Sequence, residues 1–465
     1  MDNVKEYFEG VKGKRVAFLG LGISHIPLIK KYCAYGARVT ACDMRSMEQL
    51  GADIDEIRGL DIEYHLGEDY LKGLEKFDIV FRTPGIKYFL PEIQAAVSSG
   101  VKVTSEIEMF FELCPCKIIG ITGSDGKTTT TTVISEILAK QGYTVHKGGN
   151  IGIPLFPIIE SVKPEDIAVV ELSSFQLISM KDSPQVAVVT NVTPNHLNVH
   201  KDYQEYIDAK RNLVIHQSDN SRTVLNADND VTSGVFKKDV KGELLEFSTR
   251  EMPQKGAFWD KKTGEIIFND NGKKTVIMNR KDIKLVGDHN VENYLAAICA
   301  VRGLVDDESI VCVARIFGGV EHRMELCREL GGVKFYNDSI ASSPNRTKAG
   351  LLAYNQKIIL IVGGKNKGLN YDELGTIIND KVKYLICMGD TGPMIKECTM
   401  KAANYDSEKI GIFEVEDMEQ AVNKAYSLAE SGDVVALSPA STSFDKYRNF
   451  EYRGRDFKEK VNNLR

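Results

Sequence analysis

The stretch GSDGKTTTTT, from Gly123 to Thr132, points most directly to a fold. It follows the apolar run KIIGIT at residues 117–122, which is typical of a buried strand. A strand, a glycine turn with a lysine and the start of a helix commonly cradle phosphate, because backbone N–H groups point outward at a helix N-terminus. The N–H groups of residues 123–126 would face the anion. Lys127 would reach the β and γ phosphates, and Thr128 would ligate magnesium.

This loop departs from the common Walker pattern, which places a glycine six residues before the lysine. Ile121 occupies that position, and the glycine stands at residue 123 instead. An ordinary strand-to-helix turn is the alternative interpretation. Gly-Lys-Thr directly after an apolar strand favours the phosphate loop.

Length and composition indicate a globular protein of several domains. A chain of 465 residues is too long for one ordinary core, so two to four domains are expected. The net charge of −6 gives no reason to expect nucleic-acid or membrane binding. The first residues, MDNVKEYFEG, lack the apolar core of a signal peptide, and no later apolar run could span a bilayer. We therefore expect a cytoplasmic protein.

The nine cysteines follow no repeating spacing. Cys114 and Cys116 are the only close pair, and two further zinc ligands at a suitable spacing are not evident. We therefore expect reduced thiols and no metal role for this pair.

The chain divides into three successive blocks in which strands alternate with helical stretches, a pattern typical of α/β folds with parallel sheets. We expect a Rossmann-like domain over residues 1–105, a central domain with a P-loop ATPase-type parallel sheet over residues 106–319, and a second Rossmann-like domain over residues 320–465. A small added β region is expected at residues 243–279, where Asn271-Gly272 predicts a hairpin. Strands are expected at residues 14–19, 38–42, 77–81, 117–122, 167–171, 185–190, 333–336, 357–362, 384–388 and 434–437.

The motif ITGSDGKTT at residues 121–129 resembles the ATP loop of the Mur ligases and of the related folylpolyglutamate synthetases. Further stretches occur in the order that this family shows, so the resemblance covers essentially the whole chain. They are GGNIG at 148–152, ELSSFQ at 171–176, NVTPNH at 191–196, GDHN at 287–290, HR at 322–323 and NDS at 337–339. Within the family, ELSSFQL at 171–177 and SPASTSFDKYRNFEYRG at 438–454 are most similar to members that add D-glutamate.

The resemblance implies an ATP-dependent ligase that joins D-glutamate to UDP-N-acetylmuramoyl-L-alanine in peptidoglycan precursor synthesis. Such enzymes transfer the γ-phosphoryl group of ATP to a carboxylate, and the amine then attacks the acyl phosphate. ATP and two Mg²⁺ ions are the implied cofactors. We expect a monomer without a nucleic-acid partner or membrane insertion.

By this resemblance, one group of residues holds ATP and another carries the chemistry. The ATP group comprises Gly123, Ser124, Asp125, Gly126, Lys127, Thr128, Thr129, Asn290, Asn293, Arg323 and Asp338. Arg323 would contact the γ-phosphate and Asp338 the ribose. The catalytic group comprises Lys127, Glu171, His196 and Lys210, and the metal ligands would be Thr128, Glu171, His196 and Lys210.

The local sequence around three of these residues also carries information that does not depend on the resemblance. Glu171 ends an apolar strand, at the edge where ligand sites form in α/β folds. His196 and His200 have the spacing of a zinc helix, but no acidic residue flanks His196. Lys210 looks like a surface helix lysine, and only the resemblance implies that carbon dioxide carbamylates it and that it then ligates or orients a magnesium ion.

Gly20-Leu21-Gly22 after the first strand, with Asp43 after the second, is similar to a dinucleotide fingerprint, but His25 stands where the third glycine is expected. The same turn can cradle a UDP diphosphate. The resemblance assigns the UDP substrate to Ile23, Ser24, Asp43, Met44, Thr83, Pro84, Gly85, Asn150 and Ser173.

The resemblance assigns the two carboxylates of D-glutamate to Ser342, Lys367, Ser443 and Phe450. One departure concerns the cation that many relatives carry two residues after the aspartate of NDS. Ile340 stands there in this chain, and Arg346 is the nearest candidate to replace the charge.

Three other functions remain open at this point. A Mur-type ligase for a different amino acid, or a folylpolyglutamate synthetase-like enzyme, would share the same motifs. An NAD-dependent oxidoreductase would fit the Gly20 turn but not the Lys127 loop. A non-catalytic nucleotide-binding subunit would not need Lys127, Glu171, His196 and Lys210 together.

Overall fold

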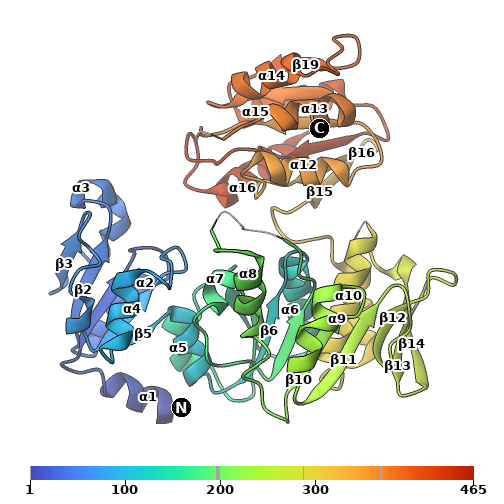
Figure 1. The fold of residues 1–465 in the computed structure, drawn as a ribbon. Helices are drawn as coiled ribbons and strands as arrows, with labels where there is room; N and C mark the ends of the chain where they lie inside the picture. Colours follow the sequence, from blue (N-terminus) through green and yellow to red (C-terminus); the bar gives the residue numbers. More distant parts are fainter. Residues whose placement is uncertain (1, 195–198, 286, 367–368) are drawn as a thin grey trace. The chain divides into compact units, whose positions relative to one another are not determined.

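The computed structural model describes residues 2–194, 199–285, 287–366 and 369–465. Three sheets follow one another along the chain, which confirms the three α/β blocks (Figure 1). The chain forms two compact units, Met1–Phe317 with the first two sheets and Gly318–Arg465 with the third.

The first sheet is entirely parallel and has the order β3-β2-β1-β4-β5. Its strands are β1 (Arg15–Leu19), β2 (Arg38–Asp43), β3 (Glu63–Leu66), β4 (Ile79–Arg82) and β5 (Lys102–Thr104). Its helices are α1 (Asp2–Glu9), α2 (His25–Ala34), α3 (Met47–Leu50), α4 (Pro91–Ser98) and α5 (Glu106–Leu113), with short 3-10 turns η1 (Gly51–Ile54) and η2 (Leu74–Lys76). Because the strands are parallel, the loops after β1, β2 and β4 meet at one edge.

The second sheet has nine strands in the order β14-β13-β12-β11-β10-β9-β6-β8-β7. They are β6 (Lys117–Thr122), β7 (Val145–Gly149), β8 (Ile167–Glu171), β9 (Val186–Val189), β10 (Arg222–Asn226), β11 (Glu243–Ser248), β12 (Lys255–Trp259), β13 (Glu265–Asp270) and β14 (Lys273–Asn279). The α-helices are α6 (Lys127–Gln141), α7 (Ser174–Leu177), α8 (Tyr203–Arg211), α9 (Asp230–Gly234), α10 (Asp288–Val301) and α11 (Asp307–Ile316). The 3-10 helices are η3 (Phe156–Ser161), η4 (Phe236–Asp239) and η5 (Arg280–Asp282).

The expected β region at residues 243–279 extends this sheet rather than standing apart from it. Strand β11 pairs in parallel with β10 and with β12, and the β12–β13 and β13–β14 pairs are antiparallel. The Asn-Gly hairpin is confirmed, since Asp270 pairs with Lys273 across Asn271 (φ 51°) and Gly272 (φ 100°).

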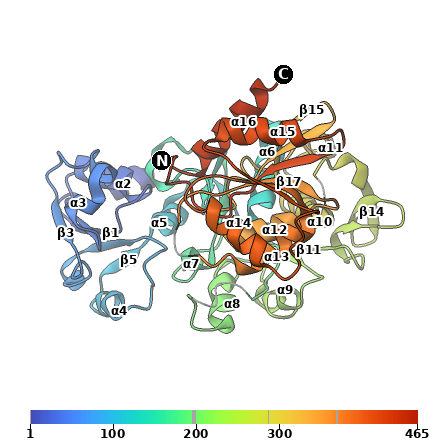
Figure 2. The same cartoon turned by 90° about the horizontal axis from the view of Figure 1, so that it is seen from above.

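The third sheet has the order β15-β16-β20-β17-β18-β19 and is parallel apart from β15. Its strands are β15 (Glu325–Leu330), β16 (Val333–Asn337), β17 (Ile358–Val362), β18 (Val382–Cys387), β19 (Gly411–Glu414) and β20 (Val434–Leu437). Helices α12 (Pro344–Leu352), α13 (Asp372–Lys381) and α14 (Gly392–Lys401) cover one face (Figure 2). Helices α15 (Met418–Leu428) and α16 (Phe450–Asn463) cover the other.

Helix α6 forms although its first half is a run of threonines, which are weak helix formers. Most of these side chains are buried, and α6 packs against both α10 and β8. Thr132 Oγ1 donates to Thr128 O at 2.8 Å, so the buried hydroxyl bonds to a carbonyl one turn back. Tertiary packing therefore decides this helix over local propensity.

Candidate functional site

The phosphate loop at residues 123–126 needs glycine at two positions. Gly123 (φ 153°) and Gly126 (φ 79°) have backbone angles that other residues rarely adopt. A Cβ on Gly123 would lie 1.9 Å from Thr190 Oγ1, and one on Gly126 would lie 2.4 Å from Asn293 Oδ1. The loop thus runs in close contact with side chains from the end of β9 and from α10.

The residues after β9 hold the loop in place. Asn191 accepts from Ser124 N through its carbonyl (2.8 Å) and from Asp125 N through Oδ1 (2.9 Å). Ser124 Oγ donates to Thr193 O at 2.9 Å, and Thr190 Oγ1 donates to Asp125 O at 2.6 Å. Two of the amides that the sequence assigned to the anion therefore bind Asn191 in this structure.

The first turn of α6 offers further amide donors. The first helical hydrogen bond runs from Thr130 N to Gly126 O at 2.9 Å, so the amides of Thr128 and Thr129 have no acceptor within the helix. The turn also adjoins α10, because Thr130 Oγ1 donates to Asn293 Oδ1 (3.2 Å) and Asn293 Nδ2 donates to Asn290 Oδ1 (3.0 Å). The structure thus brings Asn293 to the phosphate loop, with Asn290 hydrogen-bonded to it.

Two lysine ammonium groups converge on one backbone carbonyl. Lys127 Nζ donates to Gly123 O and Ser124 O, both at 2.9 Å. Lys210 Nζ donates to the same Gly123 O at 2.9 Å and to Thr122 Oγ1 at 3.2 Å. Like charges this close repel, so the arrangement favours an anion between or beside them.

Lys210 is not the surface lysine that its sequence context suggests, because it is only 1 % exposed. Its Nζ lies 4.7 Å from the centre of the Tyr206 ring. Burial lowers the pKa of Lys210 well below its usual value, the Lys127 charge lowers it further, and Glu171 and Asp125 act in the opposite direction.

Glu171 ends β8 with a side chain that is 1 % exposed. Its Oε1 accepts from Asn150 Nδ2 at 2.8 Å, whereas Oε2 is buried and has no hydrogen-bond partner among the described residues. A buried carboxylate oxygen without a partner is unfavourable. A Mg²⁺ ion prefers oxygen ligands, so Glu171 and the Thr128 hydroxyl are residues that fit such an ion.

Two predicted site residues, His196 and Lys367, lie outside the described residues. The neighbouring His200 is described and has two side-chain partners, Ser174 Oγ at Nε2 and Glu205 Oε1 at Nδ1, each at 2.9 Å. His200 is therefore engaged in packing α7 against α8. Ser173 caps α7 through a reciprocal pair of hydrogen bonds with Gln176.

Asp43 connects the loops that follow β1 and β2 in the first sheet. Asp43 Oδ2 accepts from Leu21 N at 2.8 Å, and both carboxylate oxygens accept from the Arg45 guanidinium at 3.0 Å. Burial acts to raise the pKa of Asp43, but the bonds from Arg45 and Leu21 outweigh it and lower that pKa. The carboxylate that a dinucleotide fingerprint would direct at a ribose is thus bound by its own chain.

The other residues assigned to the UDP substrate surround these loops. Gly20 lies against Thr83, because a Cβ at Gly20 would lie 2.8 Å from Thr83 Oγ1. Ile23 and Met44 are 83 % and 67 % exposed, which leaves apolar surface at the edge where the loops meet. Ser24 precedes α2 and makes no side-chain capping bond.

His25 at the third fingerprint position is a core residue. Its Nδ1 lies 2.8 Å from Gly20 O, an acceptor, so Nδ1 carries the proton. Burial lowers the pKa of His25 to about 4, and the Gly20 bond opposes that effect only in part. His25 therefore stabilises the Gly20 turn from the core and does not face a ligand.

We expect His25→Asn, which keeps a donor for Gly20 O, to flatten the pH dependence of stability. Because the folded pKa of His25 is depressed, its stabilising effect is present above the unfolded pKa and is lost as pH falls from about 6.5 towards 4. Wild-type protein should lose about 2 kcal/mol more unfolding free energy than the variant between pH 7 and pH 5. Urea unfolding followed by circular dichroism measures this, and equal losses in both proteins would contradict a neutral buried imidazole.

In the third block, considered by itself, the predicted ATP residues lie together. Asp338 follows β16 and is 6 % exposed, and burial raises its pKa to about 6. It accepts from Ser438 Oγ at 2.9 Å and from Met324 N at 3.3 Å. Arg323 is exposed and lies between His322 (φ 64°) and Met324 (φ 43°), an unusual backbone for residues other than glycine.

The residues assigned to D-glutamate lie on loops of the same block. Ser443 is 2 % exposed, and Phe450 begins α16 and accepts at its carbonyl from Ser339 Oγ at 2.7 Å. Ser342 Oγ donates to Ile340 O at 3.2 Å. Arg346 Nη1 donates to the same Ile340 carbonyl at 3.4 Å, so the alternative cation does lie beside the departure at residue 340.

Sequence reasoning missed Arg453, which is 1 % exposed on α16. Its guanidinium donates to Ser339 Oγ (3.0 Å), Ser339 O (2.9 Å) and Ser441 O (3.0 Å). The signal was available, because Arg453 shares a helix face with the buried Phe457 and Val461 at four-residue spacing.

Two groups have residue types that could suggest a transition metal. Cys114 and Cys116 have their sulfurs 3.5 Å apart and are free thiols. Among the described residues, one cluster has metal-ligand spacing, namely Glu321, His322 and Glu325. Lys458 Nζ binds both carboxylates of that cluster, at 3.2 and 2.6 Å, so a cation already occupies the acidic side.

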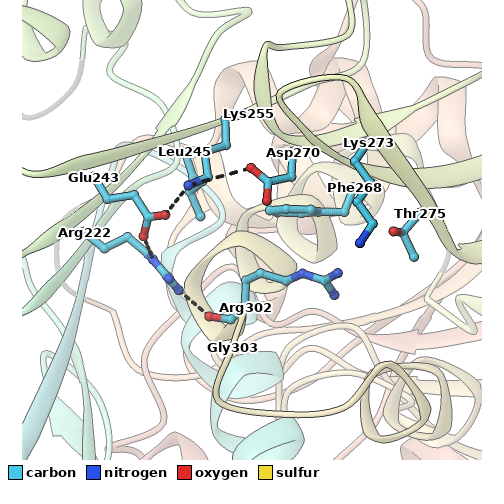
Figure 3. A pocket seen from close by; sticks show the side chains of 10 residues that line it. All are labelled: Arg222, Glu243, Leu245, Lys255, Phe268, Asp270, Lys273, Thr275, Arg302 and Gly303. Carbon is cyan, nitrogen blue, oxygen red and sulfur yellow. Dashed lines mark hydrogen bonds and ion pairs between the residues drawn. The ribbon is translucent and has the colours of Figure 1, made fainter.

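A cavity of about 250 Å³ lies between strands β10 to β14 and the end of α10 (Figure 3). Arg222 donates to Arg302 O at 2.6 Å, at the carbonyl end of α10, and to Glu243 at 2.7 Å. Lys255 pairs with Glu243 at 2.7 Å and lies 3.9 Å from Asp270. This network joins the added strands to α10, and no predicted site residue lines the cavity.

None of the helices in the described ranges is long and apolar enough to cross a bilayer.

Three family models match the chain in sequence order. The Mur ligase MurD-like N-terminal domain matches residues 14–105, the Mur ligase middle domain residues 121–301, and the Mur ligase glutamate ligase domain residues 322–441. The UDP-N-acetylmuramoylalanine--D-glutamate ligase of Acetivibrio thermocellus is 50 % identical over 99 % of both chains. The proteins of that name from Ruminiclostridium cellulolyticum and Clostridium acetobutylicum are 48 % identical over 100 % of both chains and 46 % identical over 99 % of both.

Solved structures share the fold at lower identity. MurF from Acinetobacter baumannii matches with a TM-score of 0.58 and 17 % identity over 98 % of both chains. UDP-N-acetylmuramate-alanine ligase MurC from Thermotoga maritima matches with a TM-score of 0.56 and 19 % identity, over 97 % of this chain and 99 % of that one.

Proposed function

This chain belongs to the Mur ligase family, and we infer that it is the ATP-dependent ligase that joins D-glutamate to UDP-N-acetylmuramoyl-L-alanine in peptidoglycan precursor synthesis. The observation that carries the reaction class is the position of Lys127, whose ammonium group lies over the loop at Gly123 O and Ser124 O, next to the Thr128 and Thr129 amides that have no acceptor within α6, because phosphoryl transfer between two anions needs positive charge. Full-length similarity to D-glutamate ligases carries the choice of amino acid.

The reaction makes an amide from a carboxylate, which is a poor electrophile. A carboxylate oxygen of the UDP substrate attacks the γ-phosphorus of ATP, ADP leaves, and an acyl phosphate forms. The amine of D-glutamate then attacks the acyl carbon. The tetrahedral intermediate loses phosphate and a proton to give the amide, so ATP is converted to ADP and phosphate for each bond formed.

The residues of the phosphate loop serve the first step. The ammonium group of Lys127 contacts the loop at Gly123 O and would neutralise the β and γ phosphates of ATP. The amides of Thr128 and Thr129 would donate hydrogen bonds to the same phosphates. The enzyme uses ATP and Mg²⁺, and Mg²⁺ supplies charge neutralisation and orientation of the phosphates. Glu171 and Thr128 are proposed ligands of a first ion.

We propose a second Mg²⁺ ion with His196 and a carbamylated Lys210 as its protein contacts. Carbon dioxide reacts with a neutral amine, so burial of Lys210 beside Lys127 supports the modification by favouring that form. The product, a carbamate, is an anion. It would relieve the repulsion between the two lysines and supply oxygen ligands.

The remaining assignments are proposed as they follow from the family. ATP is held also by Ser124, Asp125, Asn290, Asn293, Arg323 and Asp338. The UDP substrate is held by Ile23, Ser24, Asp43, Met44, Thr83, Pro84, Gly85, Asn150 and Ser173, and D-glutamate by Ser342, Lys367, Ser443 and Phe450. Domain boundaries at residues 1–105, 106–319 and 320–465 and a monomeric state are likewise proposals.

The test of this function is phosphate release from ATP with UDP-N-acetylmuramoyl-L-alanine and one amino acid at a time. Release should depend on D-glutamate and remain at background with L-alanine, L-lysine or diaminopimelate. A preference for another amino acid would retain the ligase class and overturn the D-glutamate assignment. Release that is independent of the UDP substrate would overturn the function altogether.

Lys367→Ala should raise the Michaelis constant for D-glutamate by at least about 30-fold, since removing the partner of a desolvated carboxylate costs about 2 kcal/mol or more. The constants for ATP and the UDP substrate should change far less. Steady-state rates with each substrate varied in turn measure this, and Lys365→Ala, an exposed lysine paired with Asp390, is the matched control. A worse constant for ATP with an unchanged one for D-glutamate would assign Lys367 to the nucleotide.

A further inference from the structure

Arg82 joins a loop of the first sheet to the segment that follows Glu171. It is the last residue of β4, and its side chain is only 2 % exposed. Nη1 donates to Ile86 O at 2.7 Å and to Thr83 O at 3.3 Å, on the loop proposed as a wall of the UDP site. Nη2 donates to Ser179 Oγ at 3.0 Å and to Phe175 O at 3.4 Å, in and just after α7.

The segment around α7 is close in sequence to the proposed chemistry. Glu171 ends β8, Ser173 caps α7, and Phe175 and Ser179 carry the two acceptors for Arg82. One planar guanidinium therefore fixes the distance between the loop after β4 and the segment after β8. A guanidinium suits this role because its donors have a rigid fork geometry.

The hydrogen bonds of Arg82 all go to neutral acceptors. The four acceptors are carbonyl and hydroxyl oxygens, and none is a carboxylate. Glu108 on α5 shares Ser179 with Arg82, and its charge favours the charged form of Arg82, while its Oε2 is buried without a hydrogen-bond partner among the described residues. Buried charges of this kind often stabilise a fold less than apolar residues of similar size.

The first block has other anchors on the second sheet. Lys31 Nζ donates to Pro157 O at 2.9 Å, Tyr35 OH donates to Glu160 Oε1 at 2.5 Å, and the Phe8 and Phe156 rings stack with centroids 5.5 Å apart. These contacts lie at η3, apart from the Arg82 loop in sequence. Loss of Arg82 should therefore leave the two blocks docked.

We propose that Arg82 is a positioning residue that holds the loop at Thr83–Gly85 in register with the segment after Glu171, so that the carboxylate of the bound UDP substrate meets the γ-phosphate. The inference rests on the proposed function. Most of the residues proposed for the UDP substrate lie on the loops of the first sheet, whereas phosphoryl transfer needs the alignment of those loops with the phosphate loop. Arg82 should therefore affect turnover more than binding.

Arg82→Met tests this role because it keeps the bulk of the side chain and removes the four hydrogen bonds. We expect kcat to fall about 100-fold, since a misplacement of about 1 Å can reduce a rate by that factor. The dissociation constant for the UDP substrate, measured by calorimetry, should stay within about threefold of the wild-type value. Arg82→Lys keeps the charge without the fork and should recover about tenfold of the lost rate.

Two further variants separate positioning from folding. Tyr35→Phe removes a hydrogen bond at the η3 contact of the same interface and should keep the wild-type kcat. Ser179→Ala removes one acceptor of Arg82 and should lower kcat by about threefold to tenfold at an unchanged melting temperature. Ser179→Ala decides the question if Arg82→Met fails to fold.

The outcomes are distinct. Wild-type kcat in both Arg82→Met and Ser179→Ala would overturn the inference alone. So would a loss confined to melting temperature and UDP-substrate binding, with kcat at saturation unchanged. Absence of D-glutamate-dependent phosphate release in the wild-type enzyme would overturn the proposed function, and this inference with it.

Discussion

Lys127→Ala should abolish turnover while binding of the UDP substrate survives. Lys127 Nζ is held over the phosphate loop by Gly123 O and Ser124 O, so its charge is already placed for the β and γ phosphates. Removing a cation from a phosphoryl-transfer site lowers rates by about 10³- to 10⁵-fold. Most of the residues proposed for the UDP substrate lie on loops of the first sheet, and none of them is Lys127, so the dissociation constant of that substrate should change little.

Phosphate release and calorimetric titration of the UDP substrate measure the two properties separately. Lys140→Ala is the matched control, because Lys140 is an exposed lysine in the last turn of the same helix and should be dispensable. Equal loss of UDP-substrate binding and activity in a folded Lys127→Ala protein would contradict the assignment. Normal activity would remove Lys127 from the site.

Lys210→Ala should lower kcat by about 10³-fold, a loss typical of removing one group from a preorganised electrostatic site. The substitution deletes a buried group that shares Gly123 O with Lys127 and whose pKa the charge of Glu171 acts to raise. If Lys210 is carbamylated, the variant also lacks an anion. Added acetate or formate should then occupy the vacant position and restore part of the rate.

A direct readout accompanies the kinetics. Wild-type enzyme equilibrated with ¹³C-labelled bicarbonate should show a carbamate carbon by NMR, and Lys210→Ala should lack it. Lys201→Ala, an exposed lysine just before α8, is the matched control and should keep both the signal and the rate. Near-normal activity of Lys210→Ala would make Lys210 structural. Loss of activity without rescue and without a carbamate signal would assign its role to the ammonium form.

Because Lys127 and Lys210 contact the same carbonyl, the charge state of each lysine depends on the other. An unmodified pair of ammonium groups on one carbonyl is unfavourable, so the site is organised for an added negative charge. Phosphate, carbamate or both can supply it. The two predictions above therefore probe one electrostatic arrangement from its two sides.

The sequence by itself was sufficient for the order of the three sheets and for the glycine loop between β6 and α6. Alternation of apolar strands with helical stretches is local, and so is the Asn271-Gly272 turn, which the structure confirms between β13 and β14. Strands β3, β5, β7, β10, β15 and β19 were not individually predicted. Several of them are short or only partly buried and therefore lack a clear apolar run. Strand β3, for example, has no fully buried residue.

The threonine run of α6 and the burial of Lys210 were decided by tertiary structure. Local propensity argues against a helix through five threonines, but packing against α10 and β8 buries most of them and satisfies hydroxyls within the helix. Lys210 has the sequence context of a surface lysine, yet it reaches Gly123, 87 residues earlier. Only the neighbouring positions of β6 and β9 in the sheet bring α8 to the phosphate loop.

The same distinction applies to Arg82, Asn191 and Arg453. Each lies next to a recognisable motif, but its partners are loops far away in sequence, and no periodicity or spacing encodes those pairings. Sequence patterns report which face of an element is buried, because that depends on a repeat of two or 3.6 residues. They do not report which polar group meets which, because that depends on strand order and on the path of loops across the ends of the sheets. Many of the helices and strands and the glycine loop could therefore be predicted from the sequence. The contact of Lys127 and Lys210 at Gly123 O, the hydrogen bonds from the loop to Asn191 and the link that Arg82 makes between two sheets arise only in the folded chain.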